Sequence, residues 1–336
     1  MSDSPPGRAP ARHRALALPT LVGVVVGGAC AAFVVRALTS QWSQVRDEVA
    51  GADVRWLVAA VVLGGAGMVW VAWCWRDALA LLGHRPPRRA TVAWYFAGEI
   101  GKYVPGGVWT VVGRGELARR GGVPGSRAYP SVALSLAALY LSALVVVVLL
   151  VPFDLAEQAA SPGPLALLLL LPLGLGALHP AVLGRARAVL HRLTGRGGEM
   201  PLPPWRDTVA LVVRYLPAWL AIWAATWCVA RAVIGDPPVL RLGVATLLSW
   251  TAGVVAVPVP AGAGVREAVF LAASGLPAGL AATVAVGGRL VFLLVDVGGA
   301  LVTAPWHRRP GEGVGGEPPP GAHPAPDTAS LQSRRE

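Results

Sequence analysis

Long apolar runs without charged residues dominate the hydrophobic pattern of this chain of 336 residues. Several runs are about 20 residues long, which is the length that an α-helix needs to cross the hydrocarbon layer of a membrane. The pattern predicts six spanning helices, at residues 15–35, 56–75, 131–153, 164–184, 208–230 and 278–306. We therefore expect an all-α, polytopic membrane protein with a single membrane domain over residues 15–306.

Two further apolar stretches differ from these runs because proline and glycine interrupt them and charged side chains lie within them. They are residues 94–123 and 250–275. Proline and glycine break helical hydrogen bonding and permit a tight reversal of the chain. We expect each stretch to form a re-entrant hairpin; the alternative for the second is that residues 242–277 cross the bilayer. The residues expected at the two tips are Pro105, Gly106, Gly107, Pro260, Gly262 and Gly264.

The basic residues indicate which loops face the cytoplasm. They are nearly all arginines, with Lys102 the one lysine, and they gather in short loops such as residues 76–89 and 185–206. Cytoplasmic loops of membrane proteins carry such an excess of basic residues. We expect a multi-pass protein of the cell membrane with its N-terminus in the cytoplasm, and disordered tails at residues 1–14 and 307–336.

Composition agrees with a membrane protein and disfavours other classes. Charged residues make up 14 % of the chain, against about 25 % in soluble domains, and the mean hydropathy is +0.57. The loop arginines account for the net charge of +11, so we expect no nucleic-acid partner. The three cysteines lie inside apolar runs and imply neither a disulfide framework nor a metal cluster. No nucleotide-binding or nucleophile motif is present, so we expect no cofactor and no metal.

The two predicted hairpins give the chain an internal repeat. Halves at residues 15–153 and 164–306 would each hold three crossings and one hairpin, so they would enter the bilayer in opposite senses. Trp94 and Trp250 precede the tip prolines by eleven and ten positions. In transporters with inverted repeats, segments interrupted by Gly and Pro at corresponding positions mark the binding site near the midplane.

Charged side chains within the apolar segments are the candidate site residues. An ionisable group at the centre of a bilayer costs about 2.5–3.5 kcal/mol on insertion scales, so it is retained mainly for a function. The candidates are Glu99, Lys102, Arg114, Glu116, Arg266, Glu267, Arg289 and Asp296. The alternative to a ligand site is that these charges pair only to fix the hairpins to the bundle.

The residue types assign a role to each candidate. We expect the ammonium of Lys102 and the guanidiniums of Arg114 and Arg266 to bind a phosphate, and Glu116 and Glu267 to hold the guanidiniums in the empty site. Glu99 and Lys102 are three positions apart, so they share a helix face and can pair. Arg289 and Asp296 are seven apart on one face of the last span, where the rival role is a structural ion pair.

Two of these segments resemble a known family. GKYVPGGVWTVVGRGELARRGGV, from residue 101, and VPVPAGAGVREA, from residue 257, resemble the two signature regions of the lysylphosphatidylglycerol synthase transmembrane-region family, also called the flippase-like domain family. The resemblance covers about residues 15–306, with Ala261 where glycine is common. It implies translocation of lipid between leaflets. The best-known relatives also carry a soluble aminoacyl-transferase domain; we expect a stand-alone member without it, because the chain ends about 30 residues after its last span.

Three functions follow from these observations. The first is a translocator of an anionic or lipid-linked substrate, with membrane lipids as its partners and no enzyme activity. The second is a membrane-embedded transferase acting on a lipid carrier, for which Glu99 or Glu116 would be the catalytic carboxylate. The third is a non-transporting subunit of a cell-envelope enzyme. The lipid, the energy source and the oligomeric state stay open.

Overall fold

The computed structural model describes residues 51–103, 108–156, 165–194, 202–255, 262 and 264–307. Within these ranges every regular element is helical, which confirms the all-α prediction. The predicted first span at residues 15–35 and nearly all of both tails lie outside the described residues, and so do four of the expected hairpin tips, Pro105, Gly106, Gly107 and Pro260.

Four segments of the described chain are long and apolar enough to cross a membrane. They are α2 (Val54–Leu81), α5 (Gly125–Ala156), the consecutive helices α8 (Trp205–Arg214) and α9 (Leu216–Val233), and α12 (Ala278–Thr303). Their positions match four of the six predicted spans. Since α2 begins where α9 ends, with the amide of Asp53 bonded to the carbonyl of Ala232, these two helices run antiparallel.

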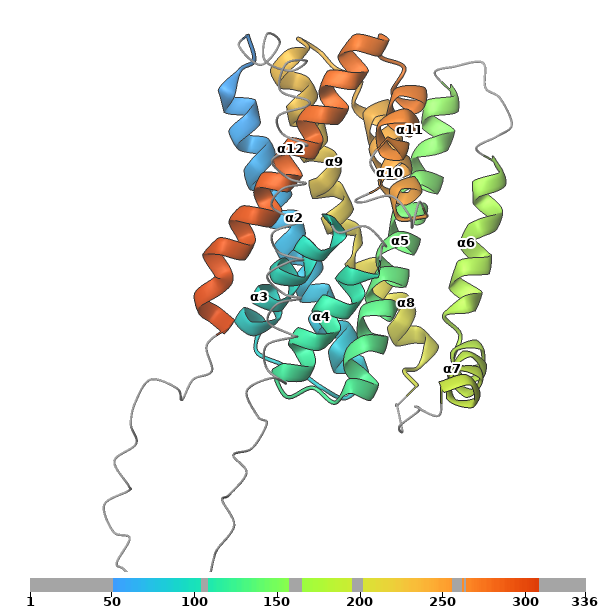
Figure 1. Cartoon of the computed structure of the whole chain (residues 1–336). Coiled ribbons are helices and arrows are strands. Elements are labelled where there is room, and N and C mark those ends of the chain that lie inside the picture. Colours follow the sequence, from blue (N-terminus) through green and yellow to red (C-terminus); the bar gives the residue numbers. More distant parts are fainter. Residues whose placement is uncertain are drawn as a thin grey trace, which may run out of the picture.

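Two pairs of shorter helices occupy opposite halves of the bundle. The first pair is α3 (Arg88–Glu99), extended by the 3-10 turn η1 (Ile100–Tyr103), and α4 (Trp109–Arg120). The second pair is α10 (Val239–Val255) and α11 (Val265–Ser274). Figure 1 shows α3 and α4 in the lower half of the view and α10 and α11 in the upper half.

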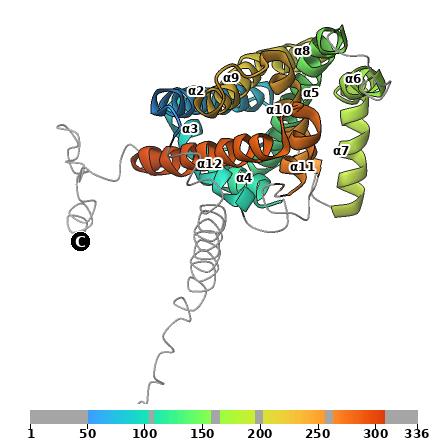
Figure 2. The same ribbon diagram turned by 90° about the horizontal axis from the view of Figure 1, so that it is seen from above.

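The structure differs from the prediction at residues 164–206. In place of one span and a basic loop, it contains α6 (Leu165–Ala177), which packs on α5, and α7 (Pro180–Thr194). Figure 1 shows α7 end-on and Figure 2 shows it lengthwise, so it lies across the bundle axis. The prediction was wrong because the arginines of this segment indicate a basic loop, whereas its apolar residues recur at helical spacing and make α7 amphipathic.

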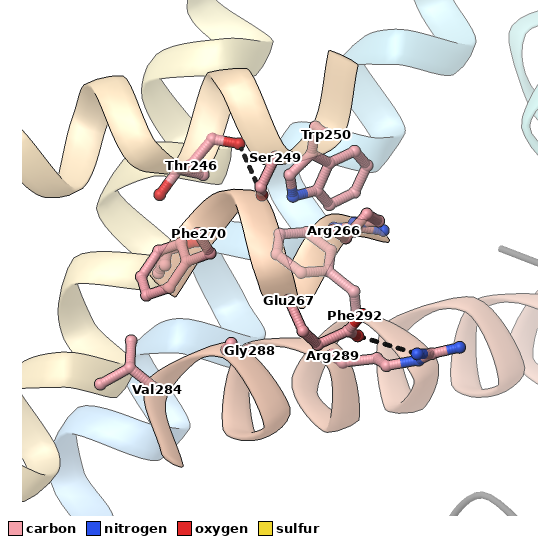
Figure 3. Close-up of a pocket in the computed structure, with 12 residues that line it drawn as sticks. Thr246, Ser249, Trp250, Arg266, Glu267, Phe270, Val284, Gly288, Arg289 and Phe292 are labelled. Carbon is pink, nitrogen blue, oxygen red and sulfur yellow. Dashed lines mark hydrogen bonds and ion pairs between the residues drawn. The ribbon is translucent and has the colours of Figure 1, made fainter. Parts of the chain in front are cut away.

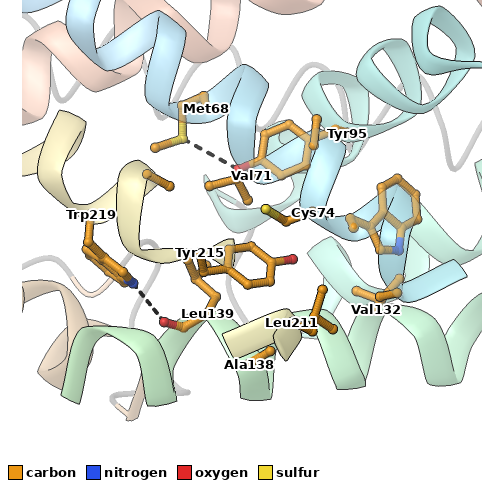
Figure 4. Close-up of a cluster of buried hydrophobic side chains, with 14 of the residues drawn as sticks. Met68, Val71, Cys74, Tyr95, Val132, Ala138, Leu139, Leu211, Tyr215 and Trp219 are labelled. Atoms are coloured by element: carbon orange, nitrogen blue, oxygen red, sulfur yellow. Dashed lines mark hydrogen bonds between the residues drawn. The ribbon is translucent and has the colours of Figure 1, made fainter. Parts of the chain in front are cut away.

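Large aromatic side chains fill the centre of the bundle. Trp75, Tyr95, Tyr215 and Trp219 are nearly or fully buried, and several of them appear in Figure 4. Their polar atoms are satisfied: the Trp219 indole donates to the carbonyl of Leu139 at 2.7 Å, and the Trp75 indole donates to a serine hydroxyl of α5 at 3.0 Å. Buried tryptophan normally needs such a partner, so these bonds fix α5 against α2 and α9.

Candidate functional site

A cavity lies between the two pairs of short helices. It encloses about 930 Å³ of space, including its open mouth. Its lining combines residues from α3, η1 and α4 with residues from α10 and α11, and α2, α5 and α9 complete the wall. The charged residues of the lining are Glu99, Lys102, Arg114 and Arg266, and its aromatic residues are Tyr95, Tyr140, Trp219 and Trp250. The structure thus brings the three predicted phosphate-binding cations to one cavity.

Glu99 joins two of these cations on the first pair of helices. Its carboxylate accepts a hydrogen bond from the Arg114 guanidinium, and its other oxygen accepts one from the Lys102 ammonium at 3.1 Å. The predicted pairing of Glu99 with Lys102 is therefore confirmed. Arg114 is 1 % exposed and also lies 4.1 Å from the centre of the Tyr95 ring. Burial with a carboxylate on one side and an aromatic face on the other fixes this guanidinium in place.

Asp296 lies behind Lys102, on α12. Its Oδ2 atom is 2.6 Å from the Lys102 ammonium and accepts a hydrogen bond from the Tyr103 hydroxyl at 2.8 Å. Asp296 is fully buried, whereas the Lys102 side chain keeps 21 % of its surface exposed. Lys102 therefore bridges two carboxylates and is the member of the Lys102–Asp296 pair that reaches the cavity.

Arg289 and Glu267 form a separate ion pair in a second, smaller pocket of about 360 Å³. The Arg289 guanidinium donates to Glu267 at 2.8 Å (Figure 3), and the other Glu267 oxygen accepts from the amide of Gly264 at 2.6 Å. Glu267 therefore caps the first turn of α11. Gly264 has a φ of +82°, which a residue with a side chain rarely adopts.

One predicted pairing is wrong as a result. Glu267 does not hold Arg266, because its carboxylate is taken up by Arg289 and the start of α11. Arg289 and Asp296 lie two helical turns apart on α12, about 10 Å, and each forms an ion pair, which was the alternative to a ligand role. Each pairs with a charge from a different pair of short helices.

Glu116 lies away from the cavity and does not hold Arg114. Its carboxylate accepts hydrogen bonds from Arg119 at 2.7 Å, Arg120 at 2.9 Å and the Tyr129 hydroxyl at 3.2 Å. The hydrogen bonds from the two arginines lower the pKa of Glu116 to about 2. The reason for the wrong prediction is helical geometry: residues two apart project in nearly opposite directions, so Arg114 faces the cavity and Glu116 faces away.

The two pairs of helices repeat one local structure around their arginines. The Arg114 guanidinium stacks on Tyr95, and the Arg266 guanidinium stacks on Trp250, each at 4.1 Å from the ring centre. Three residues after each aromatic residue comes a glycine on which the arginine packs. A Cβ atom at Gly98 would lie 2.4 Å from the Cγ of Arg114, and one at Gly253 would lie 2.4 Å from the Cγ of Arg266.

This geometry corrects the register of the repeat. Trp250 corresponds to Tyr95 and not to Trp94, whose ring instead packs on Gly121 at the end of α4. In the corrected register the aromatic residue precedes the tip proline by ten positions in both halves, and the sequences YFAG and WTAG align.

The two halves differ at one position, and this difference changes the charge of the cavity. Glu99 follows Gly98, whereas Val254 follows Gly253. Arg114 therefore has a carboxylate partner. Arg266 makes no hydrogen bond and no ion pair with the residues that the structure describes, and its one aromatic contact is Trp250. A buried or half-buried charge without a partner is costly, so Arg266 is the group in this cavity best suited to meet an anion.

The sequence profile of the lysylphosphatidylglycerol synthase transmembrane region matches residues 20–298. The chain belongs to this family. The match covers the described helices from α2 to most of α12, including both arginine sites. Together with the four apolar helices, it identifies an integral membrane protein. A comparison with curated proteins finds no match.

Within this family member, sequence reasoning missed the aromatic half of the site. Tyr95, Tyr103 and Trp250 contact the charged residues directly, yet aromatic residues in an apolar segment carry no signal of their own. The repeated aromatic-x-Ala-Gly pattern of YFAG and WTAG was the available signal, and it becomes meaningful only once glycine is known to face an arginine.

Proposed function

We propose that this membrane protein translocates a lipid with an anionic headgroup between leaflets, and that Arg266 makes the first contact with the headgroup. The observation that carries the proposal is the guanidinium of Arg266, which has no ion-pair partner among the described residues and lines a cavity of about 930 Å³, open mouth included. Phosphate is the anion that a guanidinium binds best, through two parallel hydrogen bonds. The aromatic and aliphatic wall of the cavity suits the apolar part of a lipid.

The position of the cavity supports translocation rather than simple binding. It lies where two broken helix pairs from opposite halves of the bundle meet (Figure 1). In this proposal, both pairs are re-entrant hairpins that enter the bilayer from opposite faces, and the chain is an inverted repeat with its N-terminus in the cytoplasm. Transporters with such repeats place their substrate at this junction. The plasma membrane, where leaflet composition matters to the cell, is the proposed location.

The test is a flipping assay in vesicles with a fluorescent short-chain phosphatidylglycerol. Arg266→Gln should slow flipping at least about tenfold, because a charge-assisted hydrogen bond contributes about 1.5–3 kcal/mol. Val254→Glu should have the same effect, because it places a carboxylate at the position that Glu99 occupies in the first half. Asp77→Asn, which removes an exposed ion pair with Arg214, is the matched control and should flip at the wild-type rate.

Wild-type flipping by both Arg266→Gln and Val254→Glu, at equal reconstitution, would rule out the proposal. The geometry gives less support to a transferase. Glu99 is held by two cations and Glu116 lies outside the cavity, so neither is placed as a free acid or base.

A further inference from the structure

The Lys102–Asp296 pair is a buried element of the site that headgroup binding by Arg266 does not use. Asp296 is fully buried, and its Oδ1 atom has no hydrogen-bond partner among the described residues. Its other oxygen is held by Lys102 and Tyr103. A buried carboxylate is stable only while a partner compensates its charge, so the ionised state of Asp296 depends on Lys102.

Lys102 is able to leave Asp296, whereas Asp296 cannot follow. The Lys102 side chain lines the cavity and is partly exposed, while Asp296 is not part of the lining. Lys102 is also shared with Glu99, which Arg114 already neutralises. An anion bound at Arg266 would therefore draw the Lys102 ammonium toward itself, since the two cations belong to opposite helix pairs that face the same cavity.

We propose that binding of the anionic headgroup is coupled to uptake of one proton by Asp296. The inference rests on the proposed function and adds the ion that accompanies the substrate. The proton comes from the buffered solvent through the open mouth of the cavity, leaving the conjugate base of the buffer in solution, and adds to Oδ1 when the ammonium moves to the phosphate. The bound phosphodiester adds one negative charge and the proton adds one positive charge, so the site keeps its net charge. Release of the headgroup returns the ammonium to Asp296 and the proton to water.

The charged groups around Asp296 are consistent with this exchange. Those that act on it are Lys102 and Tyr103 from η1 and Glu99 and Tyr95 from α3. From α11, Glu267 is occupied by Arg289 of α12 itself. Beside α2, Gly64 faces Phe292 and Val295 of α12, and beside α9, Val229 faces Gly287, so these contacts are apolar. The ionisable residues of α2 and α9 are Arg55, Cys74, Arg76, Asp77, Cys228 and Arg231. Lys102 is thus the one cation in contact with the Asp296 carboxylate within the described structure.

The experiment is calorimetric titration of the purified protein with dihexanoyl-phosphatidylglycerol at pH 7. Two buffers of different ionisation enthalpy give the number of protons taken up for each anion bound. A phosphodiester does not itself titrate near this pH, so the protons belong to the protein. We expect about one proton for the wild type, and an affinity that falls about tenfold for each unit of rising pH, as reciprocal linkage requires.

Two variants identify the carrier of the proton. Asp296→Asn, which is nearly isosteric, should bind the lipid with about zero proton uptake. Lys102→Gln should also take up about zero, because Asp296 would already be protonated in the empty site. Asp77→Asn should behave as the wild type. Glycerophosphoglycerol, the same headgroup without tails, distinguishes a lipid site from a site for any phosphodiester.

The possible results separate this inference from the proposed function. Binding to the wild type without proton uptake would overturn the inference and leave the anion site intact. An Asp296→Asn protein that takes up as many protons as the wild type would also overturn it. If the wild type does not bind the lipid, both the inference and the proposed function fail. Should Asp296→Asn fail to fold, the two-buffer comparison of the wild type with Lys102→Gln still decides the question, because wild-type uptake in Lys102→Gln would overturn the inference.

Discussion

Two glycines allow the arginines of the site to pack closely against a helix backbone. Gly98 and Gly253 each face an arginine side chain so closely that a Cβ atom would overlap its Cγ. The absence of a side chain at these positions therefore lets Arg114 and Arg266 lie flat between a helix backbone and an aromatic ring. Small residues allow such close approach between helices in membrane proteins.

Substitution of these glycines should displace the arginines. Gly98→Ala and Gly253→Ala should each cost about 1–3 kcal/mol through overpacking, visible as a lower midpoint of thermal unfolding in detergent. Gly65→Ala is the control, because a Cβ atom there meets nothing within 4 Å and alanine favours the helix. A Gly98→Ala protein as stable as Gly65→Ala would contradict this account of Arg114.

At this scale the sequence predicted which residues are charged and buried, but not how they pair. The cost of an ionisable group in an apolar segment singled out Glu99, Lys102, Arg114 and Asp296 without any structure. Their partners depend on how each helix is rotated about its axis. Glu116 is two positions from Arg114 in sequence, yet Glu99, fifteen positions away, is the residue that binds it.

At the scale of elements, Glu116 fastens the end of α4 to α5. It pairs with two arginines of its own helix and accepts a hydrogen bond from Tyr129 of α5. Gly115 lies directly against the Tyr129 ring, so the junction is packed as well as bonded. The outer end of the first helix pair is thereby held to a long apolar helix.

This junction should make stability depend on pH in the acid range. The pKa of Glu116 is about 2 in the folded protein, below the ordinary 4.5, so its contribution is complete above about pH 4.5 and is lost as pH falls toward 2. The difference in thermal midpoint between wild type and Glu116→Gln should be small, because the arginines are largely exposed. It should be present at pH 7 and shrink at pH 3.

The control for this prediction is Asp236→Asn, which removes an exposed carboxylate outside the junction. A difference between wild type and Glu116→Gln that stays constant from pH 7 to pH 3 would show that Glu116 does not stabilise the junction through its charge.

The sequence predicted long helices more reliably than short ones. The long uncharged runs gave α2, α5, α8–α9 and α12 with small errors at their ends, because length alone identifies a span. The sequence did not predict α6 and α7, since a short apolar helix followed by an amphipathic one resembles a span followed by a basic loop.

At the scale of the whole molecule, the two helix pairs should present their outer ends on opposite faces of the membrane. Arg89 and Ser126 lie at the outer end of the first pair, and Asp236 and Ala278 at that of the second; all four are exposed. Single cysteines at these positions, in a background without the native cysteines, should react with an impermeant maleimide in two groups. Arg89→Cys and Ser126→Cys should react from one side, and Asp236→Cys and Ala278→Cys from the other.

Labelling of Arg89→Cys and Ser126→Cys from opposite sides would instead mean that the first pair crosses the bilayer, and the two-fold arrangement would fail. The repeat was visible in the sequence because proline and glycine interrupt both segments. Its register was one residue off, because Trp94 and Tyr95 are adjacent aromatic residues, and which of them stacks on an arginine is decided only by packing.

The carboxylate of Glu99 has no counterpart in the second half, so the two arginines have different roles. Arg114, paired with Glu99 and stacked on Tyr95, contributes to the integrity of the bundle, while Arg266 has Val254 at the position of Glu99 and is stacked on Trp250 without a carboxylate partner among the described residues. Truncating the first arginine should therefore lower the yield of folded protein, and truncating the second should spare it. The two arginine sites thus serve as controls for each other: a variant at Arg114 tests folding, and a variant at Arg266 tests the proposed anion binding.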